Sequence, residues 1–357
     1  ELDCSSNDLT SLDVSGCTAL TELNCSSNDL TSLEVGGCTS LETLYCSSNQ
    51  LTSLDVGGLT ALTRLDFDAN NQLTSLDVSD CISLGGLTIR GGVDDDVRTL
   101  TSLDVSGCTA LTELVCHGNQ LTSLDVSGCT ALTELDCSSN DLTSLDVSGL
   151  TALTELVCYG NQLTGLDVRG LTFLTELECG GNQLTSLDVS GCTALTDLSC
   201  HGNQLTSLDV GGLTVLTVLN CSSNQLTSLD VGGLPALTSL NCAYNQLTSL
   251  DLSSCTVLEA VSLEQGWVLV SSDDSNRFSL SVLIQERGGE MSMVENTRVD
   301  RSEYKDDIVQ FFSPEASLSY RYETGKGGMD VTLGPASFND YAVVAIDEEH
   351  FPDFNFR

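Results

Sequence analysis

The three histidines and the many serines of this chain do not form a catalytic arrangement. His117 and His201 hold the same place in two repeats that are four repeats apart, which separates them by about 19 Å at the spacing of neighbouring strands. Two imidazoles that far apart cannot share a metal ion or a substrate atom. The sequence has no G-x-S-x-G elbow, and Gly325-Lys326 lacks the rest of a phosphate-binding loop. We therefore expect neither an enzyme nor an organic cofactor.

Acidic residues recur once per repeat and are the best candidates for metal chemistry. The row consists of Asp13, Asp55, Asp77, Asp104, Asp125, Asp146, Asp167, Asp188, Asp209, Asp230 and Asp251, with Glu34. Neighbouring carboxylates at about 4.8 Å repel each other, and bridging cations would relieve that repulsion. One hypothesis is weak calcium binding along the row, as at Asp125 and Asp146, and at Asp94, Asp95 and Asp96 in an acidic loop. The alternative is that both features are solvated acidic surface.

The 17 cysteines fall into two repeating positions. In other repeats Phe67 and Ile89 replace cysteine at the first position, and Leu59 and Leu150 replace it at the second. A position that accepts cysteine, leucine, phenylalanine or isoleucine requires a buried apolar group. We expect free buried thiols; disulfides between adjacent repeats and a metal-binding ladder are the alternatives.

A repeat of 21 residues organises the first three quarters of the chain. Asn119, Asn140, Asn161 and Asn182 mark its period, each within L-x-x-L-x-C-x-x-N-x-L, as in residues 132–142. This motif resembles the leucine-rich repeat, and the short period with the LTSLDVSG half is similar to that of bacterial surface proteins of the internalin-like type. The resemblance covers roughly residues 1–262. It implies a stacked solenoid that binds a protein or glycan partner.

Alternating apolar residues predict two parallel sheets around a narrow core. Leu135 and Cys137 would point inward from one run of each repeat, and Leu124 and Val126 from the other. We expect a mainly β chain with about 12 repeats over residues 1–265, including an insertion within 85–99. Residues 266–357 predict an antiparallel Ig-like β-sandwich. Its expected strands are Trp267–Ser271, Phe278–Gln285, Ile308–Phe312, Ser317–Tyr322, Met329–Leu333 and Tyr341–Ile346.

The formal charge of −39 excludes the basic footprint that nucleic-acid binding requires. No apolar stretch is long enough to span a membrane. Because the chain starts at Glu1, inside a repeat, we expect a processed, secreted protein in the extracellular space or on a cell surface.

Outward positions of the cysteine-bearing strands vary between repeats, whereas the acidic row does not. This variation predicts a protein-binding patch that exposes Tyr45, Val115, His117, Val157, Tyr159, Glu178 and His201. Drift on a tolerant surface is the alternative reading. The reading as a binding patch predicts adhesion or another protein interaction as the function.

A second hypothesis is a structural subunit that assembles head to tail into a filament. The uncovered first strand of one chain would accept the tail of the next. The residues concerned are Glu1, Leu2, Asp3 and Cys4 at one end and Phe351, Phe354 and Phe356 at the other.

Overall fold

The computed structural model describes most of residues 1–333 and consists of strands, turns and loops, with no helix among the described residues. The residues outside the description are 69–71, 92–99, 248–249, 253–254, 256, 259, 264–265, 273–276, 286–290, 294–296, 301–309, 312–317, 325–326 and 334–357. Beyond residue 258 the description is limited to the backbone of strands. The chain divides into two compact units, Glu1–Cys192 and Thr193–Arg357.

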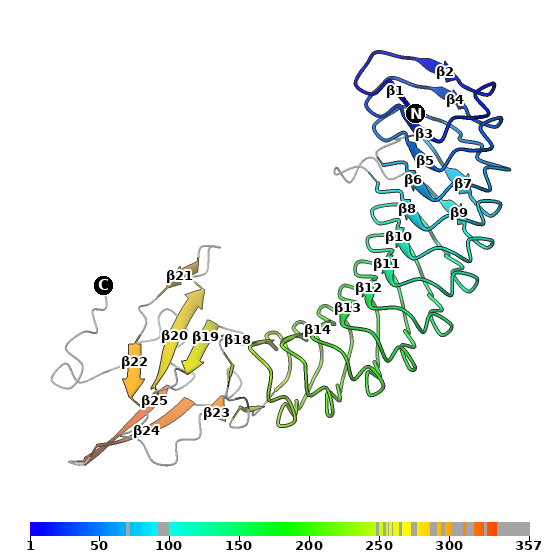
Figure 1. Cartoon of the computed structure of the whole chain (residues 1–357). Coiled ribbons are helices and arrows are strands. Elements are labelled where there is room, and N and C mark those ends of the chain that lie inside the picture. The colour runs from blue at the N-terminus through cyan, green and yellow to red at the C-terminus, as the bar shows by residue number, and fades with distance from the viewer. Residues whose placement is uncertain are drawn as a thin grey trace. The chain divides into compact units, whose positions relative to one another are not determined.

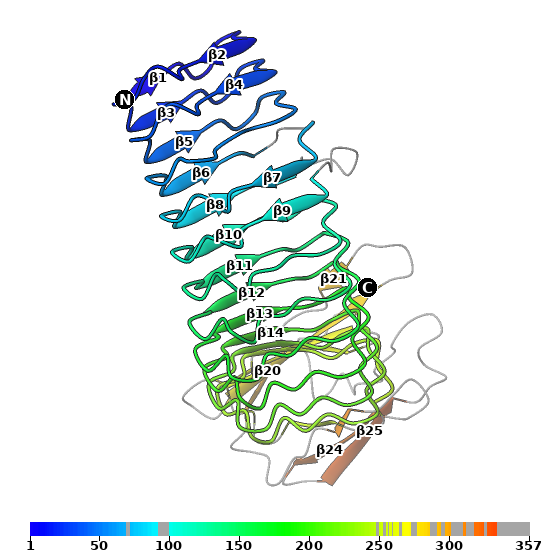
Figure 2. The same cartoon turned by 90° about the vertical axis from the view of Figure 1, so that its right-hand side faces the viewer.

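One continuous parallel sheet runs through the first unit, with one strand per repeat (Figures 1 and 2). Its strands pair in register, so that Leu114, Leu135, Leu156 and Leu177 lie side by side. In order they are β1 (Leu2–Asp3), β3 (Glu22–Asn24), β5 (Thr43–Tyr45), β6 (Arg64–Asp66), β8 (Gly86–Thr88), β10 (Glu113–Val115), β11 (Glu134–Asp136), β12 (Glu155–Val157) and β13 (Glu176–Glu178).

The second sheet is less complete than the sequence predicts. On the opposite side of the repeats, β2 (Ser11–Asp13) pairs with β4 (Ser32–Glu34), and β7 (Ser75–Asp77) pairs with β9 (Ser102–Asp104), both in parallel (Figure 2). Residues 123–125 and their equivalents in the next repeats of this unit are extended without forming a strand ladder. Leu124 and Val126 are nevertheless buried. Burial requires only that side chains alternate, and it does not require a backbone ladder.

A column of asparagines holds each repeat to the one before it. The amide nitrogen of Asn140 donates to the carbonyl oxygens of Cys116 (3.1 Å), Cys137 (3.1 Å) and Ser138 (3.2 Å). Its amide oxygen accepts the backbone N–H of Leu121 at 3.0 Å. Because these backbone groups are buried and have no water to bond, one asparagine per repeat satisfies the polar atoms at the turn.

The cysteines pack as free thiols, which confirms the expectation from the sequence. Fifteen are buried, whereas Cys4 is half-buried and Cys17 is exposed. In the second column the thiol donates to a valine carbonyl of the preceding repeat, as from Cys38 to Val14 at 3.1 Å. Burial raises the pKa of the Cys137 thiol to about 12, so the interior thiols stay protonated.

Among the described residues, a left-handed residue precedes the column asparagine and sets the turn. Serine holds this position at Ser139, with φ of 53°, whereas glycine holds it at Gly118 and Gly160. Glycine adopts positive φ without steric cost. It follows the large His117 and Tyr159 but also Gly180, whereas each serine at this position follows another serine.

The second unit begins with parallel strands and changes to antiparallel pairing. Strands β14 (Asp197–Ser199), β15 (Val218–Asn220), β16 (Ser239–Asn241) and β18 (Ala260–Leu263) are parallel. Strand β18 then pairs antiparallel with β19 (Gly266–Ser272). The pairing thus changes direction between β18 and β19, and the domain boundary expected between residues 265 and 266 stays a prediction.

Antiparallel pairs make up the rest of the described chain. Strand β20 (Arg277–Gln285) pairs with β19, β21 (Met291–Met293) and β22 (Thr297–Asp300). Strand β17 (Leu250–Asp251) pairs with β23 (Gln310–Phe311), and β24 (Leu318–Thr324) pairs with β25 (Gly327–Leu333). The strand expected at 341–346 lies outside the described residues, and the Ig-like sandwich stays a prediction.

Candidate functional site

Three columns of outward side chains cover the sheet in the first unit. In each strand the middle leucine points inward, while the first and third residues and the residue after the cysteine point outward. Over β10 to β13 the first column is Glu113, Glu134, Glu155 and Glu176; the second is Val115, Asp136, Val157 and Glu178; the third is His117, Ser138, Tyr159 and Gly180. We call this surface of β10 to β13 the sheet face.

Glutamates stack along the first column with few cations near them. Arg64 pairs with Glu113 at 3.8 Å. Partial burial and the charge of Glu113 raise the pKa of Glu134. Partial burial, followed by the charges of Glu134 and Glu176, likewise raises the pKa of Glu155. These two carboxylates therefore carry their negative charge at an energetic cost.

The apolar members of the predicted patch differ in exposure. Tyr159 is 40% exposed, as predicted, but Val115 (4%) and Val157 (8%) are buried. The expectation that these two valines expose apolar surface is therefore wrong. Tyr45, His117 and Glu178 are half-buried.

His201 belongs to the second unit, where it is half-buried. Its Nδ1 atom lies 2.9 Å from the hydroxyl of Ser199. The two units are described separately, so the structure does not bring His201 together with the other six predicted patch residues. Its membership of one patch stays a prediction.

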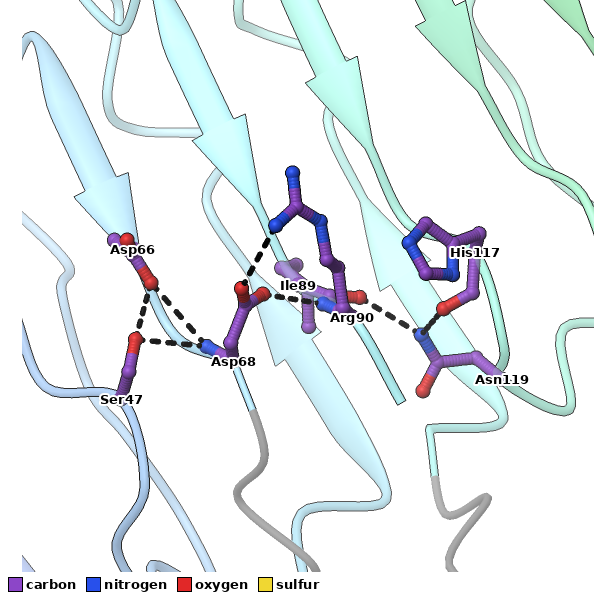
Figure 3. A network of polar contacts seen from close by, with 7 residues as sticks. All are labelled: Ser47, Asp66, Asp68, Ile89, Arg90, His117 and Asn119. Carbon is purple, nitrogen blue, oxygen red and sulfur yellow. Dashed lines mark hydrogen bonds and ion pairs between the residues drawn. The ribbon is translucent and has the colours of Figure 1, made fainter. Parts of the chain in front are cut away.

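A charged network that sequence reasoning missed lies beside the insertion (Figure 3). One carboxylate oxygen of Asp68 accepts the backbone N–H of Arg90 at 2.6 Å, and the other lies 3.6 Å from the Arg90 guanidinium. The backbone N–H of Asp68 donates to Ser47, whose hydroxyl donates to Asp66. Burial raises the pKa of Asp68, while the Arg90 contacts lower it.

The signal for this network was present in the repeat alignment. Asp68 and Arg90 stand in the third column, where most neighbouring repeats have serine. Asn119 continues the contacts by donating to the carbonyl oxygens of Ile89 at 2.9 Å and His117 at 3.3 Å (Figure 3). The paired charges fasten the irregular repeats to their neighbours, so we interpret the network as structural.

The acidic row has a structural role at the corner of each repeat. The carboxylate of Asp125 accepts the backbone N–H of Ser127 at 3.0 Å, and Asp146 accepts that of Ser148 at 3.0 Å. Such Asx turns close the corner locally. These hydrogen bonds lower the pKa of both aspartates. The Arg169 side chain lowers the pKa of Asp167 to about 2.

The structure offers no built metal centre. Among the described residues, no group of three or more histidine, cysteine, aspartate or glutamate side chains could hold a metal ion. This includes an open pocket of about 300 Å³ that Asp55, Asp77 and Asp80 line. Asp94, Asp95 and Asp96 lie outside the described residues, so calcium binding stays a prediction.

The residues predicted for head-to-tail assembly are only partly described. Glu1 and Asp3 are exposed, while Leu2 and Cys4 are half-buried. Phe351, Phe354 and Phe356 lie outside the described residues. Head-to-tail assembly stays a prediction. Within the described chain, nothing forms a helix long and apolar enough to cross a membrane.

The two kinds of carboxylate predict a stability maximum at mildly acidic pH. Glu134 and Glu155 have raised pKa values in the fold, so stability falls as the pH rises from about 4.3, the unfolded-state pKa. Asp125 and Asp146 have lowered values, so their contribution is present above about pH 4 and disappears as the pH falls below it. We expect a higher melting temperature at pH 5 than at pH 8, and a steep loss below pH 4.

The test is differential scanning calorimetry across that pH range. The double variant Glu134→Gln with Glu155→Gln should melt higher than wild type at pH 8 and change less between pH 5 and 8. The matched pair Asp125→Asn with Asp146→Asn should leave the difference in melting temperature between pH 5 and pH 8 unchanged. If both pairs reduced this difference equally, the loss of stability toward pH 8 would be due to net charge instead.

Comparison with known proteins places this architecture in a class. The model of the family "Leucine Rich repeats (2 copies)" matches residues 39–81, 109–147, 130–172 and 214–264. The chain is a leucine-rich repeat protein, which confirms the resemblance noted in the sequence. No curated protein sequence matches it significantly.

Among solved structures, the chain is similar to internalin-like proteins. The functional domain of InlJ from Listeria monocytogenes, which includes a cysteine ladder, is 40% identical with a TM-score of 0.68. The match covers 73% of this chain and 57% of InlJ, so the chain spans little more than half of that protein's length. The internalin InlF of the same species is 25% identical over 72% of this chain and 86% of its own, with a TM-score of 0.54.

A further similar structure is YopM, a leucine-rich effector protein from Yersinia pestis. It is 28% identical, with a TM-score of 0.59, and the match covers 73% of this chain and 70% of YopM. These similarities concern the stacked repeats. The repeats of the present chain are therefore internalin-like.

Proposed function

We propose that this protein is a non-enzymatic binding module that recognises a protein partner through the sheet face of β10 to β13. The main support is the contrast between two surfaces of the same repeats. The acidic row is nearly invariant because each aspartate closes its own turn. The second and third columns of the sheet face change from repeat to repeat, and the fold holds some of their residues, as where the Asp136 carboxylate accepts the backbone N–H and the hydroxyl of Ser138.

Tyr159 is the best anchor for a partner on this face. It is 40% exposed and stands beside Gly180 of the next repeat, which has no side chain. Partly exposed aromatic side chains are typical centres of protein interfaces because they bury a large area at a small entropic cost. The likeness to internalins supports an extracellular or cell-surface location and a role in adhesion.

Selection from a displayed library of random 12-residue peptides tests the proposal on the full chain. Because the face is varied and exposes the ring of Tyr159, selected peptides should bind there. We expect Tyr159→Ala to weaken them about tenfold or more. The matched control is Phe173→Ala, because Phe173 is 65% exposed but lies outside the sheet. Peptides that are insensitive to Tyr159, or equally sensitive to Phe173, would contradict the proposal.

A further inference from the structure

The sheet face combines negative charge with one exposed aromatic ring. On β12, Glu155 lies in the first column, the buried Val157 in the second, and Tyr159 follows in the third. Alternate residues of a strand are about 7 Å apart. The face therefore presents a carboxylate and an aromatic ring on one repeat, with Glu134 and Asp136 beside them on β11.

Cations are scarce in this part of the chain. Between residues 100 and 192, all of which the structure describes, Arg169 is the one lysine or arginine. It pairs with Asp167 at 2.7 Å, in the acidic row on the other side of the repeat. The cation that most affects the two central glutamates is Arg90, which lowers the pKa of Glu134 but is paired with Asp68. No cation among the described residues lowers the pKa of Glu155 in the same way.

The geometry of the sheet keeps Glu134 and Glu155 close together. The strands pair in register, so Glu134 and Glu155 lie opposite each other at the spacing of adjacent strands and cannot move apart without breaking the ladder. Both side chains are half-buried, which removes part of the water that would otherwise screen them. A cation from outside the chain would relieve both the mutual repulsion and the loss of hydration.

We propose that the partner of this face is a basic protein segment, which places lysine or arginine side chains over Glu134 and Glu155 and an apolar side chain against the ring of Tyr159. This inference rests on the proposed function and specifies the chemistry of the partner. The ring of Tyr159 adds a surface on which a guanidinium group stacks. The exposed ring of Tyr159 distinguishes such a segment from a simple polycation, which would bind any acidic surface of a chain with a net charge of −39.

The same peptide selection tests this inference when two charge-matched variants are added. We expect the selected peptides to be enriched in lysine and arginine with an apolar residue between them. Glu134→Gln with Glu155→Gln should weaken these peptides at least tenfold in 150 mM salt, measured by fluorescence anisotropy. Asp125→Asn with Asp146→Asn removes the same two charges from the other side of the repeat and should change binding by less than twofold.

Each other result has a definite meaning. Equal weakening by both variant pairs would overturn the inference, because net charge alone would then explain binding. Peptides that depend on Tyr159 but are not basic, or ignore the glutamine pair, would also overturn it while leaving the proposed function intact. Peptides that ignore both Tyr159 and the glutamates would overturn both proposals. Misfolding is a small concern, since the glutamine pair relieves repulsion and should stabilise the stack.

Discussion

Replacing Asn140 by alanine is expected to lower the free energy of unfolding by about 3 kcal/mol. The Asn140 amide satisfies three buried carbonyl oxygens and one buried backbone N–H, and these belong to two successive repeats. Alanine would leave those groups without partners in a site that excludes water. Because neighbouring repeats stabilise each other in a stack, the loss should appear in the main unfolding transition, measured by urea denaturation and circular dichroism.

The same substitution at the first repeat is the matched control. Asn7 is exposed, and its amide bonds are made within its own turn, to the carbonyl oxygens of Cys4 and Ser5. Water can replace those bonds, so Asn7→Ala should cost less than about 1 kcal/mol. If the two variants were equally stable, the asparagine column would not join the repeats as the hydrogen bonds indicate.

Thiol reactivity should separate the cysteines into two groups with a very large difference in rate. In the folded protein, two thiols should react quickly with an aromatic disulfide reagent at pH 8, and the other fifteen should react only after unfolding. The pKa of Cys137 is about 12, against an ordinary value of 9.0, which reduces the thiolate fraction roughly 1,000-fold before steric exclusion is considered. Stopped-flow absorbance with and without guanidinium chloride measures both groups.

Variants of the two accessible cysteines identify the fast group. Cys4→Ser with Cys17→Ser should remove the fast phase and leave the number of slow thiols unchanged. Cys137→Ser should remove one slow thiol and leave the fast phase intact. A total of fewer than 17 reactive thiols in denaturant would mean that some cysteines are paired, which would contradict the packing described above.

Some of this protein could be derived from the order of its residues. The repeat period, the inward leucines and the free thiols follow from the sequence, because one repeat cannot bury its apolar residues and must stack on its neighbours. Phe67 and Ile89 occupy the position of Cys137 in other repeats, which already indicated a buried apolar column without disulfides. The change to antiparallel pairing after β18 was likewise visible as the loss of the repeat motif near residue 263.

The tertiary structure decided what the outward positions do. Val115 and Val157 stand at outward positions of their strands yet are buried, which the alternation of one strand does not reveal. The acidic row also closes turns. The carboxylates of Asp125 and Asp146 each accept a backbone N–H two residues away, and this bond depends on the geometry of the turn. Stacking in register also placed Glu134 and Glu155 together. Periodicity determines which side chains face inward, but only the stacked fold determines which outward side chains meet, how they are covered and what charge they face.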